Sequence, residues 1–172
     1  RTTLIGHTGP VYAVCLRSDG QVLLTGGGDA KLMIWNVVTG ELQQEICDVF
    51  HGAIGSVCWV DFEGRGDDGF AYGCSNGTIH VYKWSPIRGQ YVFVSLTDAH
   101  RGRQVQDIRF NSKYRRIASI GDGSPCVWRI DDRGILSTMV KDAPRRAFMG
   151  RTVHFCDDGA SILATFLETH EM

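Results

Sequence analysis

The sequence lacks the long apolar runs that a membrane protein requires. Its longest run is about six residues, from Val11 to Leu16, whereas a membrane-spanning helix needs roughly 18. No charged stretch followed by an apolar one opens the chain, so no secretory signal is recognisable. With 172 residues, of which 43% are hydrophobic, the chain can form one ordinary core, and we expect a soluble protein with no membrane contact.

The sequence also has little excess of either charge. Its 18 Lys and Arg residues and 19 Asp and Glu residues give a formal net charge of -1. The strong basic balance that is typical of nucleic-acid-binding domains is therefore absent. On this ground we do not expect nucleic acid as the main partner.

No pair of the six cysteines has the C-x-x-C spacing of a metal knuckle or a redox site. Each cysteine falls in a stretch with the pattern of a β-strand. Reduced, buried thiols in a cytoplasmic or nuclear protein are the simplest interpretation, with disulfides or a metal as the alternatives.

Helical periodicity is almost absent as well. Short runs of alternating apolar and polar residues recur instead, separated by Gly, Asp and Asn turns such as Ser18-Asp19-Gly20, which is typical of many short strands. The expected strands are residues 11–17, 22–25, 31–37 and 42–49, then 56–62, 70–73, 78–84 and 91–97, then 104–110, 116–120, 125–130 and 135–140.

The strongest positive signal is a repeat. A histidine is followed after 22 to 25 residues by an acid or amide, and after six more by an aromatic residue, three times over. The three sets are His7, Asp29 and Trp35; His51, Asn76 and Tyr82; and His100, Asp122 and Trp128. Successive aromatics are 47 and 46 residues apart, about the length of one four-stranded propeller blade.

These motifs resemble a known family. Gly6-His7, Ser18-Asp19-Gly20, the run from Leu24 to Asp29 and Ile34-Trp35-Asn36 together look like one blade of a WD-repeat β-propeller. The resemblance implies an all-β fold, a partial β-propeller of four-stranded antiparallel blades that forms an open arc. It also implies a buried hydrogen-bonded chain made by His7, Thr25, Asp29 and Trp35.

The other repeats depart from this pattern. The third offers His100, Asp122 and Trp128, with Ala118 or, after a one-residue deletion, Ser119 in the hydroxyl position. A polar chain is expected there only if Ser119 supplies the hydroxyl. The second has Tyr72, Asn76 and Tyr82 in the three columns, so we do not expect the chain in that blade. Since each unpaired buried polar group costs about 1 to 3 kcal/mol, only a complete set stabilises a blade.

The repeats predict the organisation of the chain. Residues 1–5 would be an outer strand of a preceding blade, and residues 6–50, 51–98, 99–141 and 142–172 would be three complete blades and an incomplete fourth. In the fourth, Glu168 falls in the acidic column and the aromatic column lies beyond Met172. We therefore expect an excerpt of a longer protein, which needs the rest of its propeller for closure and otherwise associates through its open edges.

Two motifs suggest chemistry that the surrounding sequence does not support. Residues 73–77 fit the G-x-S-x-G elbow of serine hydrolases, but the strand-like residues 78–82 follow where a helix is required. Residues 64–69 fit G-x-G-x-x-G, again without a following helix. The ending at residues 168–171 lacks the second histidine of a zinc motif. We expect no catalytic residue, no cofactor and no metal, with a propeller hydrolase as a minor alternative.

An arginine-rich stretch supports another alternative. Residues 101–116 hold six basic residues against the single acid Asp107, and Arg145, Arg146 and Arg151 follow. This part of blades 3 and 4 could bind a phosphate-bearing ligand or RNA, but we favour the interpretation that it forms two solvated loops and a strand edge protected by charge.

The main expectation is a non-enzymatic scaffold that binds other proteins or peptides, in the cytoplasm or nucleus. By resemblance to the family, partners contact the face that carries the turns near Asp29, Asn76 and Asp122 and the start of each innermost strand. The expected contact residues are Pro10, Tyr12, Ser75, Gln104, Gln106, Met149 and Arg151. Tyr12 and Arg151 rank first because Tyr and Arg often dominate interface energies.

Overall fold

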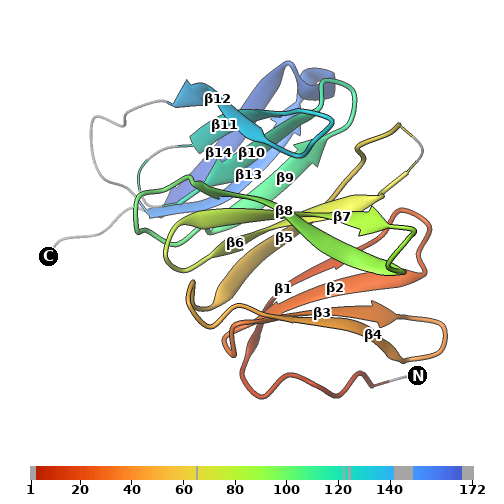
Figure 1. Cartoon of the computed structure of the whole chain (residues 1–172). Helices are drawn as coiled ribbons and strands as arrows, with labels where there is room; N and C mark the ends of the chain where they lie inside the picture. Colours follow the sequence, from red (N-terminus) through yellow and green to blue (C-terminus); the bar gives the residue numbers. More distant parts are fainter. Residues whose placement is uncertain (1–2, 65, 122, 124, 142–148, 168–172) are drawn as a thin grey trace, which may run out of the picture.

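The structure is a computed structural model, and it describes residues 3–64, 66–121, 123, 125–141 and 149–167. Three four-stranded sheets and one two-stranded sheet follow one another along the chain (Figure 1). All paired strands are antiparallel. The structure thus confirms the all-β fold and the four-stranded antiparallel sheets that the sequence predicts, set in an arc that does not close.

Each four-stranded sheet is a meander in which successive strands are neighbours. The first sheet contains β1 (Val11–Leu16), β2 (Val22–Gly27), β3 (Lys31–Asn36) and β4 (Leu42–Cys47). The second contains β5 (Ile54–Val60), β6 (Gly69–Cys74), β7 (Thr78–Ser85) and β8 (Gln90–Asp98). The third contains β9 (Asp107–Asn111), β10 (Arg116–Ile120), β11 (Pro125–Ile130) and β12 (Leu136–Lys141), and the last pairs β13 (Met149–Cys156) with β14 (Ser161–Leu167). The 3-10 turn η1 (Asp157–Gly159) joins these last two strands.

The predicted strands match these bounds within a few residues, with one instructive difference. Residues 104–106 were expected to open the strand that begins at Asp107. They bridge two sheets instead, because the Val105 N–H donates to the Cys74 carbonyl of the second sheet while the Gln106 N–H donates to the Ile120 carbonyl of the third. Hydrogen bonds to two different sheets therefore replace regular strand pairing just before β9.

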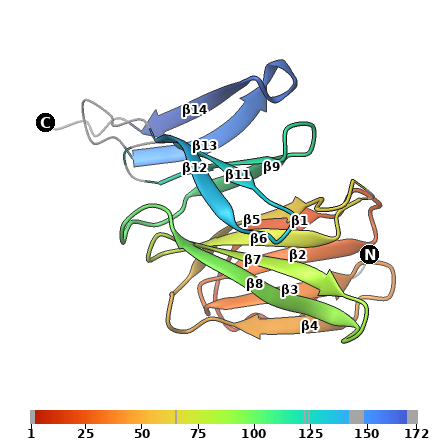
Figure 2. The same cartoon turned by 45° about the horizontal axis from the view of Figure 1, so that its top comes forward.

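The innermost strands hold the arc together. β1, β5, β9 and β13 are each the first strand of a sheet, and each contacts the next along this series. Figure 2 shows the sheets fanned around this common side. Adjacent sheets consequently face each other across apolar layers.

Three apolar layers fill the spaces between the four sheets. The first layer joins residues such as Leu24 and Ile34 to Trp59 and Phe70, and the second joins Val81 to Ile117 and other residues of the third sheet. A smaller layer of Ala118, Ile120 and Val153 lies between the third and last sheets. Burial on both faces explains why strands such as β6 are apolar throughout rather than alternating.

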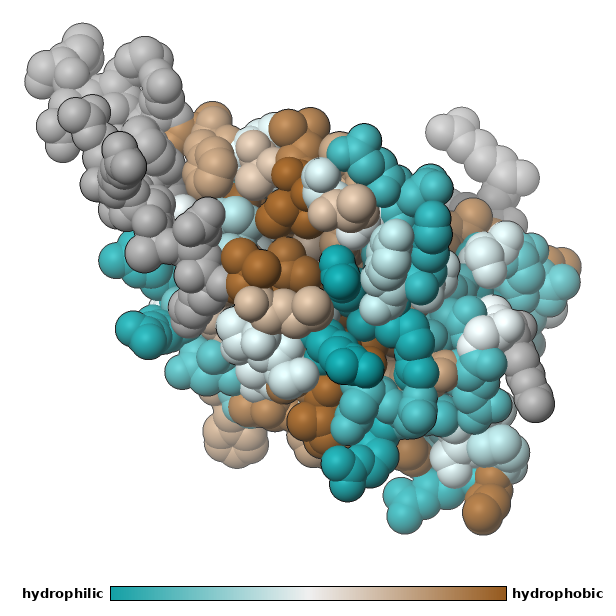
Figure 3. Space-filling view, turned by 90° about the horizontal axis from the view of Figure 1, so that it is seen from above, coloured by the Kyte–Doolittle hydropathy of each residue, from teal (hydrophilic) through white to brown (hydrophobic). Residues whose placement is uncertain are grey.

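The two ends of the arc expose the same kind of side chain that the layers bury. Val14 is 65% exposed on β1, and Leu163 is 57% exposed on β14. On the side seen from above, apolar side chains gather beside polar ones (Figure 3), and Met139 and Val140 of β12 are both exposed. The first and last described sheets, and the outer strand β12 of the third sheet, thus present apolar side chains that no other described sheet covers.

Gly26 shows how closely the first two sheets approach. A Cβ atom at this position of β2 would lie 2.5 Å from Cγ2 of Ile54 on β5. We predict that Gly26→Ala lowers the free energy of unfolding by about 1 to 3 kcal/mol, since a methyl group does not fit the layer. Chemical denaturation measures this change.

The matched background is Ile54→Ala, which removes the clashing Cγ2 atom. In that background Gly26→Ala should destabilise the protein much less, which a double-mutant cycle resolves. Equal effects of Gly26→Ala in both backgrounds would contradict the packing described.

Candidate functional site

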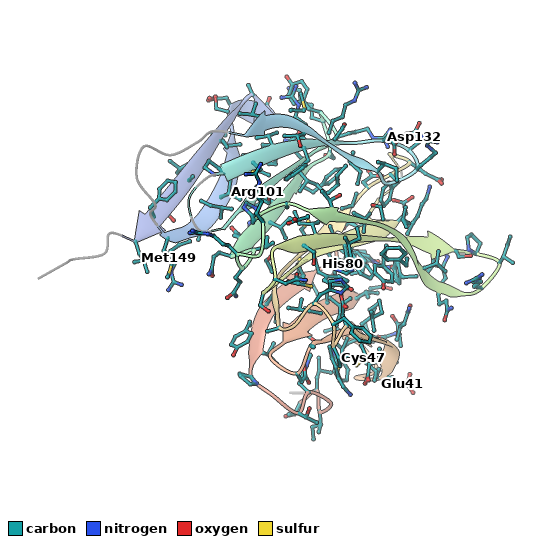
Figure 4. The ribbon with its side chains drawn as sticks, turned by 60° about the vertical axis from the view of Figure 1, so that its left-hand side comes forward. Glu41, Cys47, His80, Arg101, Asp132 and Met149 are labelled. Carbon is teal, nitrogen blue, oxygen red and sulfur yellow. The ribbon has the colours of Figure 1, made fainter. Side chains whose placement is uncertain are left out.

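The starts of the innermost strands lie together at one end of the arc. Here the Gly28 N–H donates to the Pro10 carbonyl, the Ser75 N–H to the Ala53 carbonyl, and the Gly150 N–H to the Gly121 carbonyl. We call this end the start face, defined by the predicted contact residues Pro10, Tyr12, Ser75, Gln104, Gln106, Met149 and Arg151. Arg101 and Met149 lie on the side opposite Asp132 in Figure 4.

The first sheet contains a continuous chain of polar side chains. The Trp35 Nε1–H donates to Thr25 Oγ1 over 2.9 Å, and Thr25 Oγ1 lies 2.8 Å from His7 Nε2. His7 Nδ1 lies 3.0 Å from Asp29 Oδ1. Because the Trp35 N–H can only donate, the threonine hydroxyl donates onward to Nε2, and Nδ1 carries the proton that the carboxylate accepts.

Asp29 also orders the backbone on both sides of its turn. Its carboxylate accepts hydrogen bonds from the N–H groups of Thr8 and Lys31. Partial burial acts to raise its pKa, but the bonds from Thr8, His7 and Lys31 outweigh burial and leave the pKa below its usual value. The ionised carboxylate therefore joins the segment before β1 to the β2–β3 turn.

The third sheet has a similar chain among its described residues. Trp128 Nε1–H donates to Ser119 Oγ over 2.9 Å, and His100 Nε2 lies 2.9 Å from the same oxygen. Of the two positions considered for the hydroxyl, Ser119 rather than Ala118 takes it. Asp122, the predicted acidic member, lies outside the described residues.

The second sheet has a different polar cluster, which is centred on Asp48. This residue follows β4, and its side chain is 10% exposed. His51 Nδ1 lies 2.5 Å from Asp48 Oδ1, and the Tyr72 hydroxyl donates to Oδ2 over 2.9 Å. His80 Nδ1 and Cys74 Sγ lie 3.3 and 3.8 Å from Oδ2.

Burial controls ionisation in this cluster. Burial lowers the pKa of His80 to about 4, against the opposing effect of Asp48, so its imidazole is neutral near pH 7. Burial and the charge of Asp48 raise the pKa of Cys74 to about 12. They raise the pKa of Tyr72 as well, with its neighbour Tyr82 contributing more than Asp48.

The sequence did not single out this cluster because its members are dispersed. Asp48, Cys74 and His80 come from the β4–β5 connection, β6 and β7, and no spacing motif joins them. Asn76, which occupies the acidic column of the same repeat as His51, accepts hydrogen bonds from the Thr78 N–H and hydroxyl. The one available signal was the pair of histidines in a repeat with tyrosines in place of threonine and tryptophan.

Tyr12 is the most prominent aromatic residue of the start face. It is 56% exposed, and a Cβ atom on Gly28 would lie 3.0 Å from its Cε2 atom and 3.3 Å from Cδ of Pro10. The glycine therefore lets the tyrosine ring and the proline pack against the β2–β3 turn. This packing supports the ring from below and leaves its other side open.

The remaining start-face residues come from the other three sheets. The Gln104 amide lies against Gly55, where a Cβ atom would be 2.7 Å from Nε2. Ser75 donates to the His51 carbonyl over 3.4 Å, while Met149 and Arg151 are exposed at the start of β13. The structure brings the seven predicted residues to one end of the arc.

Much of the arginine-rich stretch is paired with acids. Arg109 contacts Asp107 at 3.3 Å, Lys113 contacts Asp158 at 3.1 Å, and Arg115 contacts Asp132. Arg101 and Arg103 are exposed in the loop before β9. Arg109 and Lys113 remain exposed to solvent in these pairs, so the pairs reduce the free positive charge of the stretch without burying it.

The hydrolase-like motif does not have the geometry of a nucleophile elbow. Strand β6 is followed by a turn and by strand β7, with no helix. Ser75 donates to a backbone carbonyl, and Cys74 is completely buried.

Among the described residues, no helix is long and apolar enough to cross a membrane. All six cysteines are free thiols.

Comparison with known proteins gives one family match and several partial relatives. Residues 1–36 match the family model of the WD40 domain, G-beta repeat. Protein Atg16l2 of Mus musculus is 40% identical over 63 residues, which cover 37% of this chain and 10% of that protein. The pre-mRNA-splicing factor cwf17 of Schizosaccharomyces pombe is 27% identical over 89 residues, covering 52% and 24%.

A solved structure is similar over almost the whole chain. A chain in a crystal structure of a mitotic checkpoint complex superposes with a TM-score of 0.76 at 23% sequence identity, covering 94% of this chain and 48% of that one. This likeness shows the fold. The chain spans about a quarter or less of the two curated relatives and about half of the solved one.

Removal of the threonine hydroxyl tests the polar chain of the first sheet. Thr25→Val keeps the shape of the side chain but leaves the Trp35 N–H without an acceptor. We predict that it lowers the free energy of unfolding by about 1 to 3 kcal/mol, measured by chemical denaturation. Thr25→Ser, which keeps the oxygen, should retain most of the stability, and similar losses in both variants would argue against the hydrogen-bonded chain.

Acid should weaken the protein partly through Asp29. Because its pKa in the folded state lies below the ordinary 3.8, its contribution is present above that value and is lost as pH falls through the folded-state pKa. We predict that the stability difference between the native protein and Asp29→Asn shrinks between about pH 5 and pH 2. Denaturation curves at several pH values measure it, and a difference that is constant over this range would refute the assignment.

Proposed function

We propose that this chain, whose residues 1–36 match the WD40 domain, G-beta repeat, is a non-enzymatic scaffold that binds a protein or peptide partner through the start face. WD40 propellers commonly mediate protein interactions. Their sheets are rigid, and their loops form broad binding surfaces.

The observation that carries this proposal is the composition of the start face. Tyr12 from the first sheet and Arg151 from the last sheet are both exposed there, on strands that the apolar layers hold in place. Tyrosine and arginine side chains often dominate interface energies. Gln104 and Gln106 add hydrogen-bonding groups between them.

The absence of converging reactive groups on the described part of this face supports a binding role. Ser75 is hydrogen-bonded to a backbone carbonyl, and the histidines of the first and third sheets bond to Thr25 and Ser119 inside those sheets. An enzyme would need a nucleophile and a base directed at one point in space. We therefore favour binding over catalysis.

A reader of phosphate-bearing ligands or RNA is the second candidate. Arg101, Arg103 and Arg151 are its basis, since these three are exposed near one end. The ion pairs of Arg109, Lys113 and Arg115 reduce the free positive charge and favour the protein partner. Phosphate contacts would give binding that falls steeply with salt.

The relatives suggest where and how such a scaffold acts. The solved relative belongs to a multiprotein checkpoint complex, and the fission yeast relative is a splicing factor. We infer a cytoplasmic or nuclear protein that works in a complex and completes its propeller with further blades. Residues 1–5, 6–50, 51–98, 99–141 and 142–172 remain the proposed units.

Alanine substitutions at Tyr12 and Arg151 test the start face. The partner is first identified by affinity capture with the native protein, and its Kd is then measured by calorimetry. We predict that each substitution weakens binding by about 30-fold, the effect of losing a hot-spot side chain worth roughly 2 kcal/mol.

Matched controls are Tyr114→Ala and Arg133→Ala. They remove side chains of the same types, but from the β9–β10 and β11–β12 turns at the opposite end. These should leave the Kd unchanged within about twofold, a difference of roughly 0.4 kcal/mol. The proposal would be contradicted if the Kd stayed unchanged in the Tyr12 and Arg151 variants but rose in the control variants. A Kd that rises by orders of magnitude between about 50 and 200 mM salt would favour the phosphate reader.

A further inference from the structure

The Asp48 cluster holds three metal-ligating side chains that the proposed function does not use. Asp48, Cys74 and His80 offer a carboxylate oxygen, a sulfur and a ring nitrogen within 4.8 Å of one another. Cys74 is fully buried, and His80 is only 3% exposed. His80 is labelled in Figure 4, where it lies in the middle of the molecule.

Hydrogen bonds around Thr78 fix which nitrogen of His80 carries its proton. The Thr78 N–H donates to the Asn76 side-chain atom Oδ1, which identifies that atom as the amide oxygen. The Thr78 hydroxyl lies 2.7 Å from the same oxygen and must donate to it. His80 Nε2, at 3.0 Å, therefore donates its proton to Thr78 Oγ1.

This tautomer leaves the Nδ1 lone pair of His80 facing the carboxylate of Asp48. The two atoms are 3.3 Å apart, longer than the usual range of about 2.7 to 3.2 Å for an N–H···O bond. A lone pair and an anionic oxygen repel each other unless a cation lies between them.

We propose that Asp48 Oδ2, Cys74 Sγ and His80 Nδ1 bind a zinc ion. Zinc bonds of about 2.0 to 2.2 Å to nitrogen and oxygen and 2.3 Å to sulfur place tetrahedral ligand atoms about 3.3 to 3.5 Å apart. The observed separations from Oδ2 are 3.3 Å to nitrogen and 3.8 Å to sulfur. The three ligand atoms together lie within 4.8 Å of one another, so the sulfur and the nitrogen must move closer together to complete a tetrahedral arrangement around the ion.

The surrounding residues form the outer shell that such a site requires. His51 Nδ1 lies 2.5 Å from the other carboxylate oxygen of Asp48, and the Tyr72 hydroxyl donates to Oδ2. Thr78 orients the ring of His80 through Nε2. Outer-shell bonds of this kind hold metal ligands in their binding orientation.

Zinc binding would tie three segments of the second sheet together. The ion would link the β4–β5 connection to β6 and β7, in the sheet where Tyr72 and Tyr82 replace the threonine and tryptophan of the usual polar chain. Binding displaces the Cys74 thiol proton to solvent as the zinc–sulfur bond forms. The role is structural, and it is independent of the partner bound at the start face.

The test uses the untagged protein, treated with a chelator and then dialysed against micromolar zinc. We expect one zinc per chain by elemental analysis and a higher Tm with zinc than with chelator. Cobalt in place of zinc should give a thiolate-to-cobalt charge-transfer band and the strong visible bands of tetrahedral coordination. A protein that retains much less than one zinc per chain, or a cobalt complex without the thiolate band, would overturn the proposal.

Variants assign the ligands. Cys74→Ser should abolish the cobalt charge-transfer band and the zinc-dependent rise in Tm, whereas Cys47→Ser and Cys58→Ser should leave both intact. Thr78→Val, which removes the acceptor for His80 Nε2, should weaken zinc binding about 10- to 100-fold.

Circular dichroism in chelator checks that each variant folds, and Cys74→Ala replaces Cys74→Ser if the serine variant does not. A charge-transfer band that survives in the folded Cys74 variant would show that another thiol binds the metal and would refute the site.

Discussion

Face-to-face burial between neighbouring sheets is the constraint on which the rest of the molecule depends. A single four-stranded antiparallel sheet cannot bury both of its faces, and here each sheet obtains the missing cover from the next one. Glycines such as Gly26 allow this approach, because any side chain there would collide with the facing strand. The innermost strands are consequently held in contact at one side, and their starts are brought to a common face. The binding surface is thus a product of the packing between sheets.

Polar clusters within the sheets specify the strand arrangement more narrowly than apolar packing alone does. In the first and third sheets, a tryptophan N–H, a hydroxyl and an imidazole form an ordered chain. In the second sheet, a buried carboxylate takes the central place and gathers histidine, tyrosine and cysteine around it. A fully satisfied buried network specifies one arrangement of the strands, because every alternative leaves groups unpaired. The second sheet solves the same problem with different residues, and we propose that a metal ion takes part in the solution.

Much of the fold could be predicted from the sequence, because the repeat places chemically matched residues at equivalent points. The spacing of Trp35 and Trp128 and the glycine-rich turns indicated the strands within a few residues. The start of β9 could not be predicted, since Val105 bonds to another sheet, and a local pattern does not show such a tie. Similarly, Asp48 has an ordinary sequence context, and only the fold shows that it meets Cys74 and His80. Local periodicity thus predicted elements, whereas contacts between elements required the structure.

The claim that binding depends on the common face of the innermost strands is tested most directly by hydrogen–deuterium exchange with and without the captured partner. The account predicts slower exchange in residues 10–13, 102–106 and 149–152, which belong to three different sheets. It predicts little change in the turns at residues 18–21, 112–115 and 131–135. Protection confined to those turns, or to the exposed apolar face of β14, would contradict it.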